Sequence, residues 1–397
     1  MPATLLLLIS LAISFLCLLG MVTFRWRDYI LPYIVFKKHQ KAQTAASTNS
    51  DGISIIITSY NQAHHLKKNI PILFQQDYPK FEIIIVDESS LDDTKTVIKK
   101  LETEFEYLRH TFVPQTSRFI SKRKLAITLG IKAAHYPWVV LLEADCTPKD
   151  KAWLQTVSQQ FSEDKDFILG YTNYIDNKPA HARRAVFERM KLQFHYLSFA
   201  KRRKAFGADS CNLFIRKKYF IEHKGYADTF QVPLGEGSLL ISYLAKKHNT
   251  TICVNPQATI LQALPSVKTF KSNKILREEE ARHWNIHGKL FILKEAISNI
   301  ITLLFIANIV WFLYLRISAI AENRITYSLP ELYYDAPCLC FVILYIALPI
   351  VFLRKSTSAL SEKGFGLSVT LYELMQPCKD VLYKLRWWFR RKDFKRR

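Results

Sequence analysis

Residues 53–94 read ISIIITSYNQAHHLKKNIPILFQQDYPKFEIIIVDESSLDDT, and the rest of the fold can be worked out from this stretch. Two short Ile-rich runs, at 53–58 and 81–86, have the length and composition of buried strands, and residues 63–74 between them have helical spacing. The alternation continues, with helices expected at 91–101 and 122–134 and strands at 107–113 and 138–142. Strands that alternate with helices predict an α/β domain with a mainly parallel sheet covered on both faces.

Polar residues follow three of the predicted strands where each strand ends. They are SYN at 59–61, DESS at 87–90 and EAD at 143–145. Ligands of parallel sheets bind beyond the carboxyl ends of the strands, so we expect the functional site at these positions. No G-x-G-x-x-G follows the first strand, which argues against a dinucleotide oxidoreductase, and the chain has no G-x-x-x-x-G-K phosphate-binding loop.

Three stretches without a charged residue indicate membrane spans: 2–24, 296–315 and 336–353. A helix needs about 20 residues to cross a bilayer. A cleaved signal peptide is the alternative for the first stretch, but the sequence shows neither a basic start nor a small-residue cleavage site. Buried core helices are the alternative for the other two, although such lengths without charge favour spans.

The basic residues predict how the spans are oriented. Lys and Arg are concentrated at 25–41, after the first span, and at 384–397, whereas the loop between the last two spans carries Arg324 beside two glutamates. Basic residues accumulate on the cytoplasmic side. We therefore expect a multi-pass protein of the cytoplasmic (inner) membrane, with its N-terminus outside and its large middle domain and tail facing the cytoplasm.

The net charge of +22 predicts anionic partners, such as lipid head groups or nucleotide phosphates. Two basic stretches that contain aromatic residues, 181–206 and 386–397, could suit nucleic acid. In a chain with membrane spans we interpret them as surfaces that touch anionic lipid, and we expect no nucleic-acid partner. The seven cysteines show no C-x-x-C spacing, so reduced thiols are expected.

These patterns divide the chain into eight segments. They are a membrane anchor at 1–25, a basic juxtamembrane segment and linker at 26–50, the α/β domain at 51–265, an amphipathic membrane-surface segment at 266–295, spans at 296–315 and 336–353 around an external loop at 316–335, and a basic cytoplasmic tail at 354–397.

The α/β domain resembles the family 2 glycosyltransferases of GT-A fold. Y-N follows the first strand, Q-x-Y-P precedes the second, and V-D-x-x-S-x-D-x-T spans 86–94. SKRKLAITLGIKAA at 121–134 and WVVLLEADCTP at 138–148 are similar to the next helix and to the D-x-D strand end of that family. The likeness covers about residues 50–290, and its motifs are specific in combination.

The resemblance implies a nucleotide-sugar donor, expected to be a UDP-sugar, and a divalent cation, Mg or Mn, on its diphosphate. It assigns the metal to Asp145 with Glu143. The residues it places at the nucleotide sugar are Thr58, Tyr60, Asn61, Asp87, Ser89, Lys124, Glu143 and Ala144. Other roles stay open: Asp87 could cap the helix expected from residue 91, Asp145 could be a turn residue, and Lys124 or its neighbour Arg123 could pair with phosphate or be merely solvated.

The sequence departs from the family pattern at several positions. Glu143-Ala144-Asp145 stands for D-x-D, and GADSCN at 207–212 stands for G-x-G-x-N. In LGEGSLL, Glu236 matches the first acid of the later acidic pair, and Gly237 replaces the second, the usual catalytic base. Glu236 is the remaining candidate for that base. The Q-x-x-R-W-type segment appears as EEARHW, where Arg282, His283 and Trp284 would contact acceptor or diphosphate, or Trp284 could be an interfacial anchor.

These features favour an inverting glycosyltransferase that moves a sugar from a nucleotide-sugar donor to a lipid-linked or growing envelope glycan. The alternative is a catalytically inactive relative that binds nucleotide or glycan, or acts as a scaffold subunit in envelope polysaccharide assembly. Gly237 is the main support for that alternative.

Overall fold

The computed structural model describes residues 3–43, 51–114, 121–175, 180–321, 332–362 and 365–395. It divides into two compact units, Met1–Tyr33 with Leu290–Leu382, and Ile34–Lys289 with Tyr383–Arg397. Part of the expected linker (44–50), part of the expected external loop (322–331) and the last two residues of the tail lie outside the described residues.

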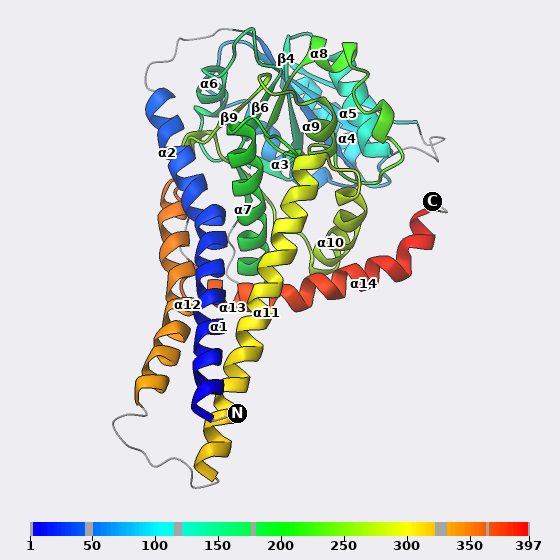
Figure 1. Cartoon of the computed structure of the whole chain (residues 1–397). Coiled ribbons are helices and arrows are strands. Elements are labelled where there is room, and N and C mark those ends of the chain that lie inside the picture. Colours follow the sequence, from blue (N-terminus) through cyan, green and yellow to red (C-terminus); the bar gives the residue numbers. More distant parts are fainter. Residues whose placement is uncertain are drawn as a thin grey trace. The chain divides into compact units, whose positions relative to one another are not determined.

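A seven-stranded sheet forms the centre of the second unit (Figure 1). Its order is β3-β2-β1-β4-β8-β6-β9, and its first four strands run parallel. The strands are β1 (Ile53–Ser59), β2 (Phe81–Asp87), β3 (Leu108–Phe112), β4 (Trp138–Glu143), β6 (Phe167–Gly170), β8 (Leu213–Arg216) and β9 (Thr250–Cys253). The mainly parallel α/β sheet predicted from the sequence is therefore confirmed, and β8 is the strand that runs antiparallel to both of its neighbours.

Helices cover both faces of the sheet, which explains why β1 is buried along its whole length. Ile55 and Ile57 point to one face and pack with Leu66 and Ile98, from α3 (Ala63–Leu73) and α4 (Thr94–Glu104). Ile56 points to the other face, where α5 (Lys122–Ala133) lies. The approach of α5 is so close that a Cβ on Gly130 would lie 2.4 Å from Cγ2 of Ile56.

The expected helix at 91–101 begins later, at Thr94. The Asp92 carboxylate accepts hydrogen bonds from the backbone N–H of Thr94, at 3.1 Å, and from its hydroxyl. Ser89 has a positive φ of 68°, which turns the chain before this point. The loop after β2 therefore takes up residues 88–93, and the helix starts where Asp92 satisfies its first turn.

A small sheet and two long helices lie beyond the ends of the strands. The sheet has the order β5-β10-β7, from β5 (Cys146–Pro148), β10 (Ile260–Gln262) and β7 (Thr172–Tyr174). Gln262 pairs with Cys146 on one side and Tyr174 on the other. The helices are α7 (Ala180–Lys201) and α10 (Val267–Ala281). The shorter helical elements of this unit are α6 (Trp153–Ser158), α8 (Lys217–Glu222), η2 (Ala227–Thr229), α9 (Ser238–Leu244) and η3 (Pro256–Ala258).

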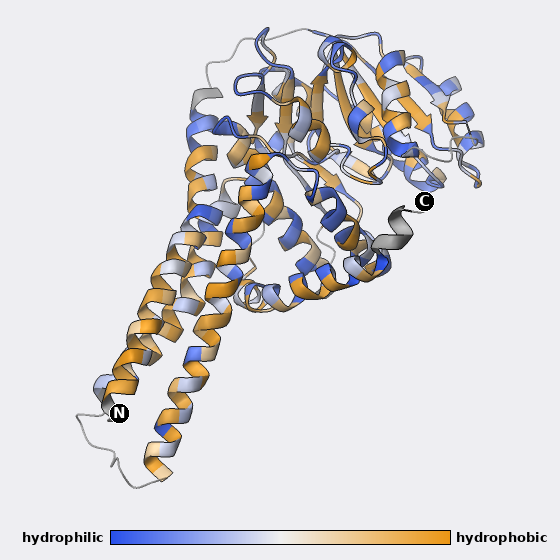
Figure 2. Ribbon diagram, turned by 45° about the vertical axis from the view of Figure 1, so that its right-hand side comes forward, coloured by the Kyte–Doolittle hydropathy of each residue, from blue (hydrophilic) through white to orange (hydrophobic). Residues whose placement is uncertain are grey.

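Three helices in the described residues are long and apolar enough to cross a membrane: Leu5–Lys41, Ile286–Ala321 and Tyr333–Ser358. Their hydrophobic character is visible in Figure 2. The first runs from α1 (Ala3–Arg25) through a π-helical turn (Trp26–Ile30) into α2 (Leu31–Gln43), and the others are α11 (Ile286–Ala321) and α12 (Leu332–Ser358).

The first helix continues beyond residue 25, where the expected anchor ends. Arg25 is buried there, and its guanidinium forms ion pairs with Glu373 at 2.8 Å and Asp28 at 3.5 Å. Because protein carboxylates neutralise this charge inside the unit, the basic residue does not end the helix. Glu373 belongs to α13 (Ser368–Leu374), and α14 (Gln376–Lys395) follows, so the expected tail is largely helical in the described residues.

Candidate functional site

The ends of β1, β2 and β4 meet, as the parallel sheet predicted. Ser59 pairs with Asp87, and Thr58 pairs with both Val86 and Glu143. Asp87 is buried, and its Oδ1 accepts a hydrogen bond from the backbone N–H of Ser90 at 3.0 Å. Its Oδ2 is also buried and has no hydrogen-bond partner in the described part of the chain. An unsatisfied buried carboxylate oxygen is costly unless a ligand donates to it.

Three of the predicted donor-binding residues form the loops around this point. Asn61 has a positive φ of 52°, and its Oδ1 accepts from the backbone N–H of Leu91 at 2.7 Å. The Ser89 hydroxyl donates to the carbonyl of Val113. These two side chains hold the loops in place, while Tyr60 is half exposed. The backbone of Ala144 continues the strand end, since its N–H donates to the Thr58 carbonyl at 3.3 Å and its carbonyl accepts from Asn69.

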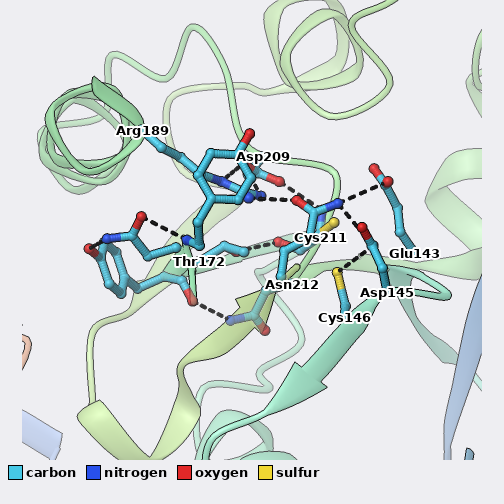
Figure 3. Close-up of polar contacts among 12 residues, drawn as sticks. Glu143, Asp145, Cys146, Thr172, Arg189, Asp209, Cys211 and Asn212 are labelled. Carbon is cyan, nitrogen blue, oxygen red and sulfur yellow. Dashed lines mark hydrogen bonds and ion pairs between the residues drawn. The ribbon is translucent and has the colours of Figure 1, made fainter. Parts of the chain in front are cut away.

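Glu143 and Asp145 face one amide group. The Nε2 atom of Gln262 donates to Oε2 of Glu143 and to Oδ1 of Asp145, each at 3.0 Å. Its Oε1 accepts from Arg189, which also forms an ion pair with Asp209 at 2.8 Å (Figure 3). Burial and the nearby Glu143 raise the pKa of Asp145 to about 6. The two carboxylates repel each other, and a positive or hydrogen-bonding group between them relieves this repulsion.

The neighbouring cations Arg123 and Lys124 point to different places. Arg123 forms ion pairs with Glu143 at 3.2 Å and Glu88 at 3.5 Å, and it lines the cavity described below. Lys124 is fully buried, and its ammonium donates to the carbonyls of Thr229 and Val232 at 2.7 and 2.8 Å. Burial lowers the pKa of Lys124 to about 8. The structure thus places Arg123 at the site and uses Lys124 to tie α5 to the loop at 229–232.

Glu236 is a buried carboxylate at the same site. Its side chain is 6% exposed, and Oε1 has no hydrogen-bond partner within the described ranges. Burial raises the pKa of Glu236, although Arg123 and Lys124 oppose that effect. Gly237, next in the chain, has no room for a side chain: a Cβ there would lie 2.7 Å from backbone atoms of Ala208, Asp209 and Ser210.

A cavity of about 420 Å³ is lined by Arg123, Glu143, Asp145 and Glu236, whereas Asp87 is not among its lining residues. It lies beside the strand ends, and α7 and α10 contribute much of its wall. Its charged lining residues are Arg123, Glu143, Asp145, Glu188, Arg189, Asp209, Glu236, Lys274, Arg277 and Glu280. Arg277 makes no hydrogen bond or ion pair with any described residue, so it is a guanidinium available to an anion in the cavity.

The predicted acceptor or diphosphate residues at the end of α10 do not line this cavity. Arg282 pairs with Glu279 at 3.5 Å and lies over the ring of Trp387, and His283 is 3.9 Å from the same glutamate. Trp284 is buried, donates to Glu280 at 3.1 Å and packs against Phe206, so it is a core residue of this unit.

Among the cavity residues that sequence reasoning missed are Arg189, Asp209, Gln262 and Arg277. Gln262 lies on a strand of only three residues, and Arg189 and Arg277 lie in the stretches 181–206 and 266–295, which the sequence led us to interpret as membrane-surface segments. A resemblance at 207–212 pointed to the loop of Asp209, but no spacing in the sequence brings these four side chains together.

Comparison with known proteins identifies the domain. Residues 54–224 match the model of glycosyl transferase family 2. The hyaluronan synthase of Pasteurella multocida is 27% identical over 155 residues, which are 38% of this chain and 15% of that protein. Glycosyltransferase AglE of Haloferax volcanii is 27% identical over 170 residues, 42% of this chain and 52% of that protein. The chain thus spans from about one seventh to half of the length of these relatives.

A solved structure agrees on the fold. The mannosyltransferase PcManGT from Pyrobaculum calidifontis, in complex with GDP-Man and Mn2+, superposes with a TM-score of 0.53. The likeness covers 95% of this chain and 99% of that chain at 16% sequence identity. Residues 54–224 therefore form a glycosyl transferase family 2 domain, and the chain has the GT-A fold that its sequence predicted.

Proposed function

We propose that this protein is a membrane-anchored inverting glycosyltransferase, which transfers a sugar from a nucleotide-sugar donor to a lipid-linked or growing envelope glycan. One observation carries the proposal: the buried carboxylate of Glu236, whose Oε1 has no hydrogen-bond partner in the described part of the chain, lines the same cavity as Glu143 and Asp145. Relatives named as hyaluronan, chondroitin and poly-beta-1,6-N-acetyl-D-glucosamine synthases support a glycan acceptor.

The donor would lie across the strand ends. The free oxygen of Asp87 suits an N–H group of the nucleotide base, and we expect the donor to be a UDP-sugar. Arg123 and Arg277 are the cations we assign to the diphosphate, in place of Lys124 and Arg282. Arg123 is already oriented by Glu143 and Glu88, and Arg277 makes no hydrogen bond or ion pair within the described ranges.

The side chains beside the proposed diphosphate position fit Mg or Mn as metal ligands. Glu143 and Asp145 offer carboxylate oxygens, and the Nε2 of Gln262, which donates to both, shows that the two carboxylates converge on one point. Hard divalent cations prefer such ligands, and the mannosyltransferase of similar fold was solved with Mn2+. When bound, the cation would neutralise the charge that develops on the leaving diphosphate.

The chain's own residues would perform the proton transfer. Glu236 accepts the proton of the acceptor hydroxyl as the oxygen of that hydroxyl bonds to the anomeric carbon, and the bond from that carbon to the diphosphate breaks. Attack opposite to the leaving group inverts the configuration. A base works best when its pKa lies near the working pH, and the burial of Glu236 raises its pKa in that direction.

The three apolar helices would anchor the enzyme. We propose a multi-pass protein of the cytoplasmic membrane with the GT-A domain on the cytoplasmic side, since the basic residues at 25–41 and 384–397 favour that orientation. We keep the division into segments predicted from the sequence. The three apolar helices are longer than the charge-free stretches from which they were predicted.

The test uses membranes from cells that lack the native protein, resupplied with wild type, Asp145→Ala or Glu236→Gln at matched expression. Release of nucleoside diphosphate is followed with a panel of nucleotide sugars and Mn or Mg. We expect one donor to be consumed with wild type and neither variant to support its use. Equal release from wild-type and empty membranes would contradict the proposal and favour a non-catalytic binding or scaffold subunit.

A further inference from the structure

We propose that Asp209 binds the acceptor, as a carboxylate that receives hydrogen bonds from the acceptor's hydroxyl groups beside the reacting one. This inference rests on the proposed glycosyl transfer. It assigns a role to Asp209, a residue to which the family pattern quoted above gives none. It starts from Gly237, which stands where the family has a carboxylate.

The loop at 207–212 fills the space next to Gly237. A Cβ on that glycine would lie 2.7 Å from the carbonyl oxygen of Ala208, 2.7 Å from the carbonyl carbon of Asp209 and 2.7 Å from the nitrogen of Ser210. These are backbone atoms, so a side chain at 237 cannot be accommodated by a rotamer change. The two departures from the family pattern, at 207–212 and at 237, are therefore one structural change.

The same loop brings a different carboxylate to the cavity wall. Asp209 lines the cavity, and its side chain is 19% exposed. Its Oδ2 pairs with Arg189 at 2.8 Å, and its Oδ1 accepts from the backbone N–H of Cys211 at 3.0 Å. A carboxylate offers about four lone-pair positions. Arg189 also donates from Nε to Oδ2 at 3.0 Å, so Oδ2 is held by two bonds, and the remaining acceptor capacity of Asp209 is on Oδ1.

The two carboxylates have different surroundings and hence different roles. The Asp209 carboxylate is oriented by its ion pair with Arg189, which suits it to accept hydrogen bonds from sugar hydroxyls. Glu236 has an oxygen with no partner among the described residues and suits the proton transfer. Tyr174 also lines the cavity, and Arg189 stacks on its ring at 4.3 Å, so this part of the wall is held rigidly.

The experiment separates acceptor binding from chemistry. Purified full-length protein in detergent receives the donor identified by the panel, and solubilised membranes of the deletion strain are titrated as the acceptor source. We expect Asp209→Asn to raise the half-saturating amount of acceptor by about 10- to 100-fold, with the maximal rate within about threefold of wild type. Glu236→Gln should lower the maximal rate instead. Donor affinity, measured by calorimetry, should stay unchanged in both.

Asp164→Asn is the matched control, because Asp164 is an exposed carboxylate that pairs with Lys165. It should behave as wild type. Asp209→Glu should recover part of the acceptor affinity. If Asp209→Asn leaves the half-saturating acceptor amount unchanged, or weakens donor binding equally, Asp209 only holds Arg189 and the inference is wrong. If wild type releases no nucleoside diphosphate above background, the proposed function fails and the inference with it.

Discussion

The two sides of the cavity were assembled in different ways. On the side proposed for the donor, Asp87 and Glu143 end β2 and β4, and Asp145 follows Glu143 by two residues. The parallel register brings both strand ends to one edge of the sheet, with β1 between them. Gln262 joins this side to the side proposed for the acceptor, because its amide donates to Glu143 across 119 residues of sequence and accepts from Arg189 across 73. The first side follows from local pattern and sheet geometry, while the second depends on how loops and helices pack.

This difference also separates what the family keeps from what this chain changed. The donor side retains carboxylates at the expected positions, with Glu143 in place of Asp. The acceptor side has lost a carboxylate at Gly237 and has a loop whose backbone fills that space.

The largest expected effect is on Glu236. Glu236→Gln should reduce the rate of nucleoside diphosphate release by about 10²- to 10⁴-fold, because it removes the proton acceptor. In wild type, the rate should rise as pH increases through the pKa of Glu236, which burial moves above the usual range of a glutamate. The release rate of wild type and Glu236→Gln, measured as a function of pH, tests both expectations. An unchanged acid limb in Glu236→Gln would assign the base to another group.

The next effect distinguishes the neighbours on α5. Arg123→Met should raise the KM for the donor by about 10- to 100-fold, because a charged hydrogen-bond donor is lost from the cavity. Lys124→Met should leave that KM unchanged, because the Lys124 ammonium is occupied by the carbonyls of Thr229 and Val232. Steady-state kinetics with the identified donor test this. The opposite ranking would restore Lys124 as the phosphate ligand.

A smaller effect concerns Gly237. Gly237→Ala should lower the free energy of unfolding by about 1–3 kcal/mol, because its Cβ overlaps the backbone of 208–210. For the same reason Gly237→Asp should not increase activity. Thermal unfolding in detergent measures the change, with the exposed Lys218→Ala as a control. A stable, more active Gly237→Asp would show that the loop yields easily and would favour the view that the present chain is inactive.

A further effect is a pH dependence of stability that comes from Lys124. Its folded pKa of about 8 lies below the ordinary value of 10.5, so between these values the unfolded chain binds more protons. The contribution of Lys124 to stability should therefore rise from pH 8 to pH 10.5, and it should be lost as pH falls through this range. Melting temperatures of wild type and Lys124→Met across that range give the slope. Parallel curves would mean that Lys124 stays charged in the folded protein.

The membrane helices are a second case in which the local sequence pattern does not predict the structure fully. Charge-free stretches located all three apolar helices, but they placed the end of the first near residue 25. The helix continues because Glu373 and Asp28 neutralise the buried Arg25. Such a partner, almost 350 residues away in the case of Glu373, leaves no trace in the sequence around the helix.

The sequence by itself determined the α/β class, the family 2 resemblance, and the strand-end carboxylates Asp87, Glu143 and Asp145. Hydrophobic periodicity is a local property, and a parallel register converts it directly into neighbouring strand ends. Only the tertiary structure decided that Arg123 faces the cavity and Lys124 does not, that Gln262 bridges the two acids, and that the loop of Asp209 fills the space beside Gly237. Those outcomes depend on the direction of single side chains and on backbone contacts between distant segments, which no periodicity encodes.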